Sequence, residues 1–231
     1  MVFIIFNEWF TFSLILLGIW FIVFFAGKKC RKKLLIVSLF TMLFGLSEPL
    51  FVPTYWHPPS LFNLAASTGF DVESLIFSFA VGGIGATLYD LIFRIRHNKM
   101  SMKDMHGRRH RYHKLALASP FIAFAILYLV TKLNPIYSAT IALCIGGLAT
   151  MLCRPDLSMR IIIGGFLFLT IYFIFFLSFN LAYPYALTNI WNLSSISGIL
   201  ILGIPLEELM FAFSFGLMWS SVYEHFNWYL N

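Results

Sequence analysis

Residues 204–224 read IPLEELMFAFSFGLMWSSVYE, an apolar run that opens with two carboxylates. Pro205 suits the first turn of a helix, because its missing N–H would have no partner there. The run that follows is long enough to cross a bilayer. Glu207 and Glu208 are therefore expected at or inside the membrane boundary. An ionised carboxylate at the bilayer centre costs roughly 2.5–3.5 kcal/mol, so acids placed there are candidates for a functional site.

The same pattern occurs earlier in the chain, displaced by one constant offset without a gap. The aligned pairs are Glu207 with Glu73, Phe211 with Phe77, Phe213 with Phe79, Gly216 with Gly82, Tyr223 with Tyr89 and Glu224 with Asp90. Upstream, Trp191 falls within one residue of the position that matches Trp56, and both precede their helix in segments rich in Pro or Ser. The chain is therefore predicted to contain two copies of one membrane module.

The composition is that of a membrane protein. Of the 231 residues, 60% are hydrophobic and 11% are charged, which excludes an ordinary soluble domain. The net charge of +6 comes from basic residues in short loops, so membrane topology explains it without nucleic acid. Cys30, Cys144 and Cys153 have no paired spacing, and they indicate neither a disulfide framework nor a zinc site.

The apolar runs predict an all-α polytopic membrane protein with about seven transmembrane helices. The start of the chain lacks the pattern of a cleaved signal peptide, so the first run is expected to remain as a helix. The expected helices are 9–27, 34–51, 71–93, 115–133, 135–153, 161–182 and the run from Pro205. Residues 52–70 and 183–203 are expected to be irregular, and 196–204 is too short to span and is expected to be re-entrant or interfacial.

Basic loops follow the first, third and fifth expected helices, and the positive-inside rule makes their side cytoplasmic together with the C-terminus. The N-terminus is then outside the cell membrane. Residues 1–94 form the first three-helix repeat, 95–134 a basic loop with a linker helix, and 135–231 the second repeat. The linker helix restores the orientation, so the repeats are predicted to be parallel.

The acids and the aromatic residues point to chemistry on an apolar molecule. Glu207 shares a helix face with Phe211, and Glu73 shares one with Phe77, while Glu48 is a further buried acid. A carboxyl group in apolar surroundings tends to keep its proton near neutral pH, so it is a possible proton donor. The alternative is that hydrogen bonds from Asn, Tyr or backbone groups satisfy these acids, which then only hold the repeats together.

Aromatic residues make up 19% of the chain, and ring faces can stabilise a carbocation by about 2 kcal/mol or more when desolvated. Most of them are expected to face lipid or to pack between helices. The repeat selects six as candidates for substrate binding: Phe77, Phe211, Phe79, Phe213, Trp56 and Trp191. Tyr89-Asp90 and Tyr223-Glu224 are interpreted as interface anchors and as salt-bridge partners of nearby basic residues.

The histidines give no metal site by their spacing. His106, His110 and His113 resemble the pattern of membrane di-iron oxygenases, but those sites need more than the six histidines of this chain. Arginines and a lysine are interleaved with these histidines, and their charge opposes cation binding. A cytoplasmic loop against anionic lipid headgroups is the preferred interpretation, and no metal or other cofactor is expected.

Each of the two modules joins an aromatic, Pro-rich segment to a helix that opens with an acid, and the second module contains Pro205-Leu206-Glu207-Glu208. In this pattern the chain resembles the lycopene cyclase domain family. The resemblance implies a redox-neutral cyclisation of the acyclic ends of lycopene to β-rings. The first copy departs from the pattern, because Asp71-Val72-Glu73-Ser74 lacks the proline and the second acid.

Among the acids, Glu207 is expected to matter most for such a reaction and Glu73 next, with smaller effects at Glu208 and Glu48. Two other functions stay open. One is a cyclase of another carotenoid or polyene, and the other is a proton-coupled transporter, since parallel repeats with acids also describe such proteins. The lipid bilayer and a hydrophobic polyene are the expected partners of a cyclase.

Overall fold

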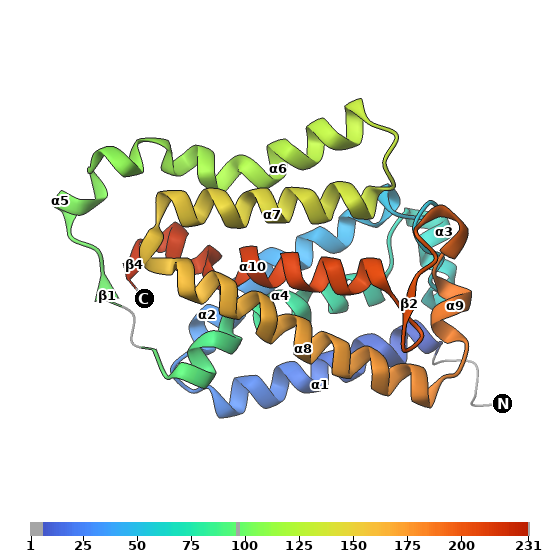
Figure 1. Ribbon diagram of the computed structural model, residues 1–231. Helices are drawn as coiled ribbons and strands as arrows, with labels where there is room; N and C mark the ends of the chain where they lie inside the picture. Colours follow the sequence, from blue (N-terminus) through green and yellow to red (C-terminus); the bar gives the residue numbers. More distant parts are fainter. Residues whose placement is uncertain (1–6, 96–97, 231) are drawn as a thin grey trace. The chain divides into compact units, whose positions relative to one another are not determined.

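The computed structural model describes residues 7–95 and 98–230, and helices make up most of it (Figure 1). Six helical segments are long and apolar enough to cross a membrane: Glu8–Ala26, Arg31–Leu50, Val72–Phe93, Arg108–Val130, Pro135–Cys153 and Pro155–Ala182. They confirm the prediction of an α-helical protein with several membrane-spanning helices. The seventh expected span, α10 (Leu206–Asn227), has 22 residues but lies outside this group, since its polar residues lower its hydropathy. The count of seven stays a prediction.

The chain divides into two compact units, and each unit contains two separate parts of the sequence. The first unit comprises the described residues up to 84 together with 172–209. Its elements in chain order are α1 (Glu8–Ala26), α2 (Arg31–Met42), the 3₁₀ helices η1 (Leu43–Leu50) and η2 (Leu61–Asn63), α3 (Leu64–Thr68), the first half of α4 (Val72–Phe93), the end of α8 (Ser158–Ala182), α9 (Ala186–Ile190), η5 (Leu193–Ser195), β2 (Leu200–Ile201), β3 (Ile204–Pro205) and the first turn of α10.

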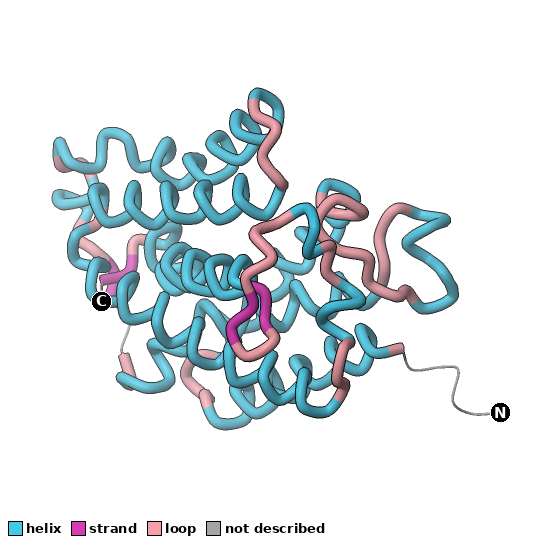
Figure 2. Tube along the Cα trace, turned by 45° about the vertical axis from the view of Figure 1, so that its right-hand side comes forward, coloured by secondary structure: helices cyan, strands magenta, loops and turns pink. Residues whose placement is uncertain are grey.

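The second unit comprises residues 85–171 and the described residues from 210 onward. Its further elements are β1 (Asn98–Lys99), α5 (Met102–Met105), η3 (Arg108–Tyr112), α6 (His113–Val130), α7 (Pro135–Cys153), η4 (Pro155–Leu157) and β4 (Tyr229–Leu230). Helices α6 and α7 lie side by side in both views (Figures 1 and 2). Strand β1 pairs antiparallel with β4, so the end of the chain is tied to the loop after α4.

Local sequence explains where α1 begins and how closely α2 and α4 pack. The side chain of Asn7 caps α1 by accepting a hydrogen bond from the N–H of Phe10 at 2.6 Å. Within the first unit, α2 and α4 approach closely at Gly82, because a Cβ there would lie 2.1 Å from the hydroxyl oxygen of Thr41. A small residue at this position therefore lets the two helices pack closely.

The two segments expected to be irregular contain only short helices, turns and one hairpin (Figure 2). The predicted re-entrant piece 196–204 contains most of that hairpin, in which β2 and β3 pair antiparallel. The expectation that Pro205 lies in the first turn of a helix was wrong, because Pro205 pairs with Leu200 in β3 and α10 begins at Leu206. Gly203, with a φ of +83°, adopts the left-handed conformation that the turn between β2 and β3 requires. The side-chain amide of Asn180 holds this turn by donating to the carbonyl of Leu202 at 3.3 Å.

A backbone bridge joins the two irregular segments inside the first unit. Trp56 and Trp191 form an isolated antiparallel β-bridge. On either side of it, the N–H of His57 donates to the carbonyl of Ile190 at 2.6 Å, and the N–H of Asn192 donates to the carbonyl of Tyr55 at 2.9 Å. The two tryptophans that the sequence pattern equates therefore meet directly, and the bridge fixes the segments that carry them.

Candidate active site

Glu208, in the first turn of α10, accepts three side-chain hydrogen bonds in the first unit. The hydroxyl of Tyr55 and the indole N–H of Trp191, which lies 2.8 Å away, both donate to Oε1. The hydroxyl of Tyr172 in α8 donates to Oε2 at 2.8 Å. All four side chains are buried. Both oxygens of this carboxyl group are thus held by neutral donors from three different segments.

Aromatic rings surround these donors. Trp56 lies between two other indoles, with ring centroids 4.6 Å from Trp9 and 5.7 Å from Trp191. Phe176 packs against Trp191 at 5.7 Å and against Tyr172 at 4.7 Å. Together these rings form an aromatic cluster of Trp9, Phe12, Trp56, Phe77, Tyr172, Phe175, Phe176, Phe179 and Trp191. Among its members, Trp9 and Phe12 in α1 are completely or almost completely buried.

Glu208 forms no ion pair with any residue of the described chain. Burial without a cation is costly for an ionised carboxylate unless hydrogen bonds replace the lost water. The three donors supply that replacement. Burial raises the pKa of Tyr55 well above its usual range, and the nearby Glu208 carboxylate adds to the rise. Tyr55 therefore keeps its proton and remains a hydrogen-bond donor at any physiological pH.

Glu207 and Glu73, the acids at the equivalent positions of the repeat, make a different kind of contact. Oε1 of Glu207 accepts the backbone N–H of Ser197 at 2.9 Å. Oε1 of Glu73 accepts the backbone N–H of Leu61 at 2.7 Å and the amide of Asn7 at 2.9 Å. Each acid thus binds the irregular segment that precedes its own helix. These contacts fit the alternative that the repeated acids hold segments in place.

Glu48 lies in η1 and contacts another acidic residue, Asp71, just before α4. The N–H of Asp71 donates to Oε2 of Glu48 at 2.9 Å, and the N–H of Ser74 donates to Oδ1 of Asp71 at 2.5 Å. Burial raises the pKa of Asp71. The hydrogen bond from Ser74 opposes this rise, and the charge of Glu73 adds to it. Glu48 is therefore placed where it fixes the entry to α4.

The aromatic residues selected by the repeat divide into two groups. Trp56, Trp191 and Phe77 belong to the aromatic cluster around Glu208. Phe79 packs instead against Trp20, at 5.0 Å between ring centroids. The second unit contains the other two, Phe211 against Phe215 at 5.6 Å and Phe213 against Phe166 at 5.0 Å.

Sequence reasoning missed the two tyrosines that hold Glu208. Tyr55 directly precedes Trp56, so the segment was recognised but the hydroxyl was not. Tyr172 is one residue in a run dense in Phe, where no spacing distinguishes it. A buried hydroxyl among phenylalanines requires a hydrogen-bond partner, and this requirement was the available signal.

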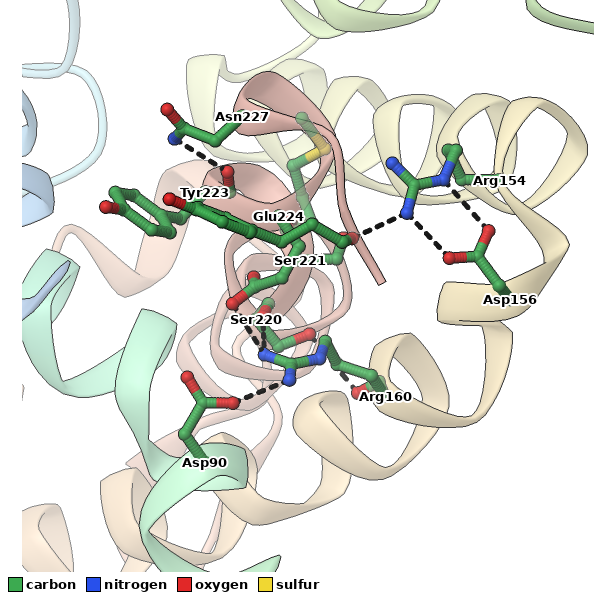
Figure 3. Close-up of polar contacts among 11 residues, drawn as sticks. Asp90, Arg154, Asp156, Arg160, Ser220, Ser221, Tyr223, Glu224 and Asn227 are labelled. Carbon is green, nitrogen blue, oxygen red and sulfur yellow. Dashed lines mark hydrogen bonds and ion pairs between the residues drawn. The ribbon is translucent and has the colours of Figure 1, made fainter. Parts of the chain in front are cut away.

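The second unit contains another group of buried charges (Figure 3). The guanidinium of Arg160 in α8 pairs with Asp90 at 2.6 Å and with Glu224 at 3.0 Å, and it lies 4.8 Å from the ring centre of Tyr89. The prediction that Asp90 and Glu224 are salt-bridge partners of basic residues is confirmed. Two acids that the sequence repeat aligns thus share one arginine.

A comparison with protein families finds one match, to the family described as lycopene cyclase, over residues 134–226. The matched region includes Tyr172, Trp191, Glu207 and Glu208, whereas Tyr55 and Glu73 precede it. No curated protein and no solved structure matches the chain. The family implies an enzyme that is a carotenoid cyclase and a hydrophobic carotenoid as its substrate. Residues 134–226 of the chain are thus similar to the lycopene cyclase family, which supports the resemblance inferred from the sequence.

Proposed function

We propose that the chain is a lycopene β-cyclase, which converts the acyclic ends of lycopene to β-rings without net oxidation or reduction. The observation that supports this most directly is the carboxyl group of Glu208, buried beside the aromatic cluster and held by three neutral donors. The reaction needs a proton donor, a base, aromatic walls and exclusion of water. The buried carboxyl group of Glu208 and the aromatic cluster beside it, all in the first unit, support their assignment to these roles.

Glu208 is proposed to begin the reaction by donating its proton to the terminal double bond of the polyene. One C–H bond forms, the double bond is lost, and a tertiary carbocation results. The proton leaves a carboxylate behind, and stabilising that carboxylate lowers the barrier. Hydrogen bonds from Tyr55, Tyr172 and Trp191 are already directed at its two oxygens, so they stabilise the charge as it develops.

The carbocation is next to be attacked by an internal double bond, which closes the ring and moves the positive charge onto a ring carbon. Ring faces attract a cation, by about 2 kcal/mol or more where water is absent. Trp191 and Tyr172 contact Glu208 and also belong to the aromatic cluster, so they link the acid to these faces. Burial of the cluster also keeps out water, which would trap the cation as an alcohol.

Loss of a ring proton completes the cycle. The Glu208 carboxylate is the proposed acceptor: one ring C–H bond breaks, the ring double bond forms, and the carboxyl group regains its proton. No electrons are gained or lost by the enzyme, so the reaction has no need of a redox cofactor. Glu207 and Glu73, with their contacts to Ser197 and Leu61, are proposed to position the segments around Glu208.

Expression in a lycopene-producing host, followed by pigment analysis, tests the proposal. A cyclase yields products with one or two rings, and their spectra and retention times identify the ring type. A proton-coupled transporter leaves the pigment unchanged, and a cyclase of another polyene converts that polyene and leaves lycopene untouched. Unchanged lycopene in cells that contain the inserted protein would therefore contradict the proposal. The Glu208→Gln variant is the matched negative control.

We also propose seven membrane spans with the N-terminus outside and the C-terminus in the cytoplasm. The support is the excess of basic residues in the loops after the first, third and fifth expected helices. Reporters fused after Asn231 and inserted near Gly107 should both read as cytoplasmic. Opposite locations for the two reporters would contradict the parallel arrangement of the repeats.

A further inference from the structure

A group of metal-ligand side chains lies in the second unit, apart from the residues assigned to the reaction. Sγ of Cys153, at the end of α7, lies 3.6 Å from Nδ1 of His110 and 3.7 Å from Nδ1 of His113. The three atoms lie within 4.8 Å of one another. His110 lies within η3, His113 begins α6 and Cys153 ends α7, so three consecutive helical elements supply the three side chains.

The two distances from Cys153 suit a tetrahedral metal ion, whereas the 4.8 Å spread of the group means that the two histidine nitrogens approach each other when the ion binds. With Zn–S near 2.3 Å and Zn–N near 2.0–2.1 Å, neighbouring ligand atoms of a tetrahedral zinc site lie about 3.4–3.6 Å apart. The two distances from Cys153 are within about 0.2 Å of this range. Hydrogen bonding is the alternative explanation, since the S–H can donate to one ring nitrogen while the sulfur accepts the N–H of the other, and the experiment below separates the two.

His225, near the end of α10, adds a second and independent observation. Its ring lies 4.5 Å from that of His113, centroid to centroid, and its side chain is fully buried. Nδ1 is 3.2 Å from the hydroxyl of Thr150, whereas Nε2 has no hydrogen-bond partner in the described chain. A contact of this kind to one ring nitrogen is what fixes a metal-binding histidine, and it leaves the other nitrogen as a donor atom.

The charges nearby do not oppose a cation as strongly as the sequence suggests. Arg108, Arg109, Arg111 and Lys114, which alternate with the histidines, are exposed to solvent, whereas His110 and His113 turn inward. Arg154, the buried cation beside the group, is held by both oxygens of Asp156 at 2.9 and 2.6 Å (Figure 3).

We propose that His110, His113 and Cys153 bind a zinc ion, and that His225, which lies outside this group of three in the structure, supplies Nε2 as the fourth donor after its side chain shifts toward the ion. A thiolate with imidazoles suits Zn²⁺ better than Mg²⁺ or Ca²⁺, which prefer oxygen ligands. Trp228 stacks on His113 at 3.8 Å and lies edge-on to His110 at 5.1 Å, so it holds both rings in place. The ion would tie the basic loop, the end of α7 and the end of α10 together, which is a structural role.

Cobalt substitution in the purified full-length chain tests this directly. Co²⁺ bound by a thiolate and imidazoles gives visible bands of tetrahedral cobalt and a sulfur-to-cobalt charge-transfer band. Both are expected in the unaltered protein, at about one equivalent, and Zn²⁺ should abolish them by displacement. Absence of the charge-transfer band in the unaltered, folded protein would overturn the proposal, and this outcome does not depend on any variant being stable.

Variants then identify the ligands. Cys153→Ser should remove the charge-transfer band and weaken Co²⁺ binding at least tenfold, whereas Cys144→Ser in the same helix should change neither. His113→Ala and His225→Ala should also weaken binding, and His106→Ala, at an exposed histidine of the same loop, is their control. Equal binding by Cys153→Ser and the unaltered protein would show that the cobalt sits elsewhere, and would contradict the proposal.

Discussion

Glu208 and Glu224 lie near opposite ends of one helix, and both are buried, yet their surroundings differ in kind. Glu224 pairs with the guanidinium of Arg160, so its charge is neutralised by a fixed cation. Glu208 has only neutral donors, two hydroxyls and an indole N–H. A neighbouring guanidinium favours the ionised form of a carboxyl group, whereas neutral donors place no fixed charge beside it. The comparison separates an acid that holds the fold from an acid available for chemistry.

Replacing Glu208 by Gln should have the largest effect on activity. Glutamine keeps the size of the side chain but carries no exchangeable acid proton, so ring formation should fall by at least about 100-fold. Ring products per unit of inserted protein, measured in lycopene-producing cells, give the value. Glu224→Gln is the informative counterpart, because it should lower the amount of folded protein without a comparable loss in products per molecule. Substantial cyclisation by Glu208→Gln would remove this residue from the mechanism.

Replacing Arg160 by Met should have the largest effect on stability. The change leaves Asp90 and Glu224 buried without their cation, and breaking a buried pair from one side destabilises by about 3–5 kcal/mol. Thermal unfolding in detergent, followed by tryptophan fluorescence, measures the loss. Arg109→Met, at an exposed arginine of the basic loop, is the control and should change little. Equal unfolding temperatures for the two variants would contradict the assigned role of Arg160.

Replacing Tyr172 by Phe should have an intermediate effect on activity. The ring stays in the aromatic cluster, but one of the three donors to Glu208 is lost. A hydrogen bond to a charged group contributes about 1.5–3 kcal/mol, so the rate should fall roughly tenfold or more. Tyr183→Phe is the control, because it removes a hydroxyl from a tyrosine that does not contact Glu208. A rate for Tyr172→Phe equal to that of Tyr183→Phe would show that this hydroxyl is dispensable.

Replacing Glu207 by Gln should have the smallest effect, since the amide oxygen can still accept the N–H of Ser197. The sequence pattern alone predicts the opposite, because Glu207 occupies the repeated position. Glu207→Ala should reduce the amount of folded protein by leaving that N–H without its partner, which costs about 1–3 kcal/mol. Glu73→Gln and Glu73→Ala should behave in the same way. Loss of ring products in Glu207→Gln at normal protein levels would restore Glu207 as the principal acid.

The helices could be predicted from the sequence more fully than the site. The helix 135–153 has the bounds expected, because Asn134 and Pro135 start it and Arg154 with Pro155 ends it. That the acids would be buried also followed from apolar runs. Which acid meets the aromatic cluster did not follow, because Tyr55 and Tyr172 reach Glu208 from distant segments. The same limit hid the approach of Cys153 to His110 and His113, since spacing along one loop says nothing about a residue forty positions away.

The backbone bridge between Trp56 and Trp191 joins segments that are far apart in the sequence, so the site can form only late in protein synthesis. Tyr55 and Glu208 lie 153 residues apart, which takes roughly 8–30 s to synthesise at about 5–20 residues per second. During that time the first helices enter the membrane while the segment at Trp56 lacks its partner strand. The acid and its donors come together only when nearly the whole chain has emerged. Under the proposed mechanism, the nascent chain is therefore unable to generate a carbocation before the aromatic cluster has assembled around Glu208.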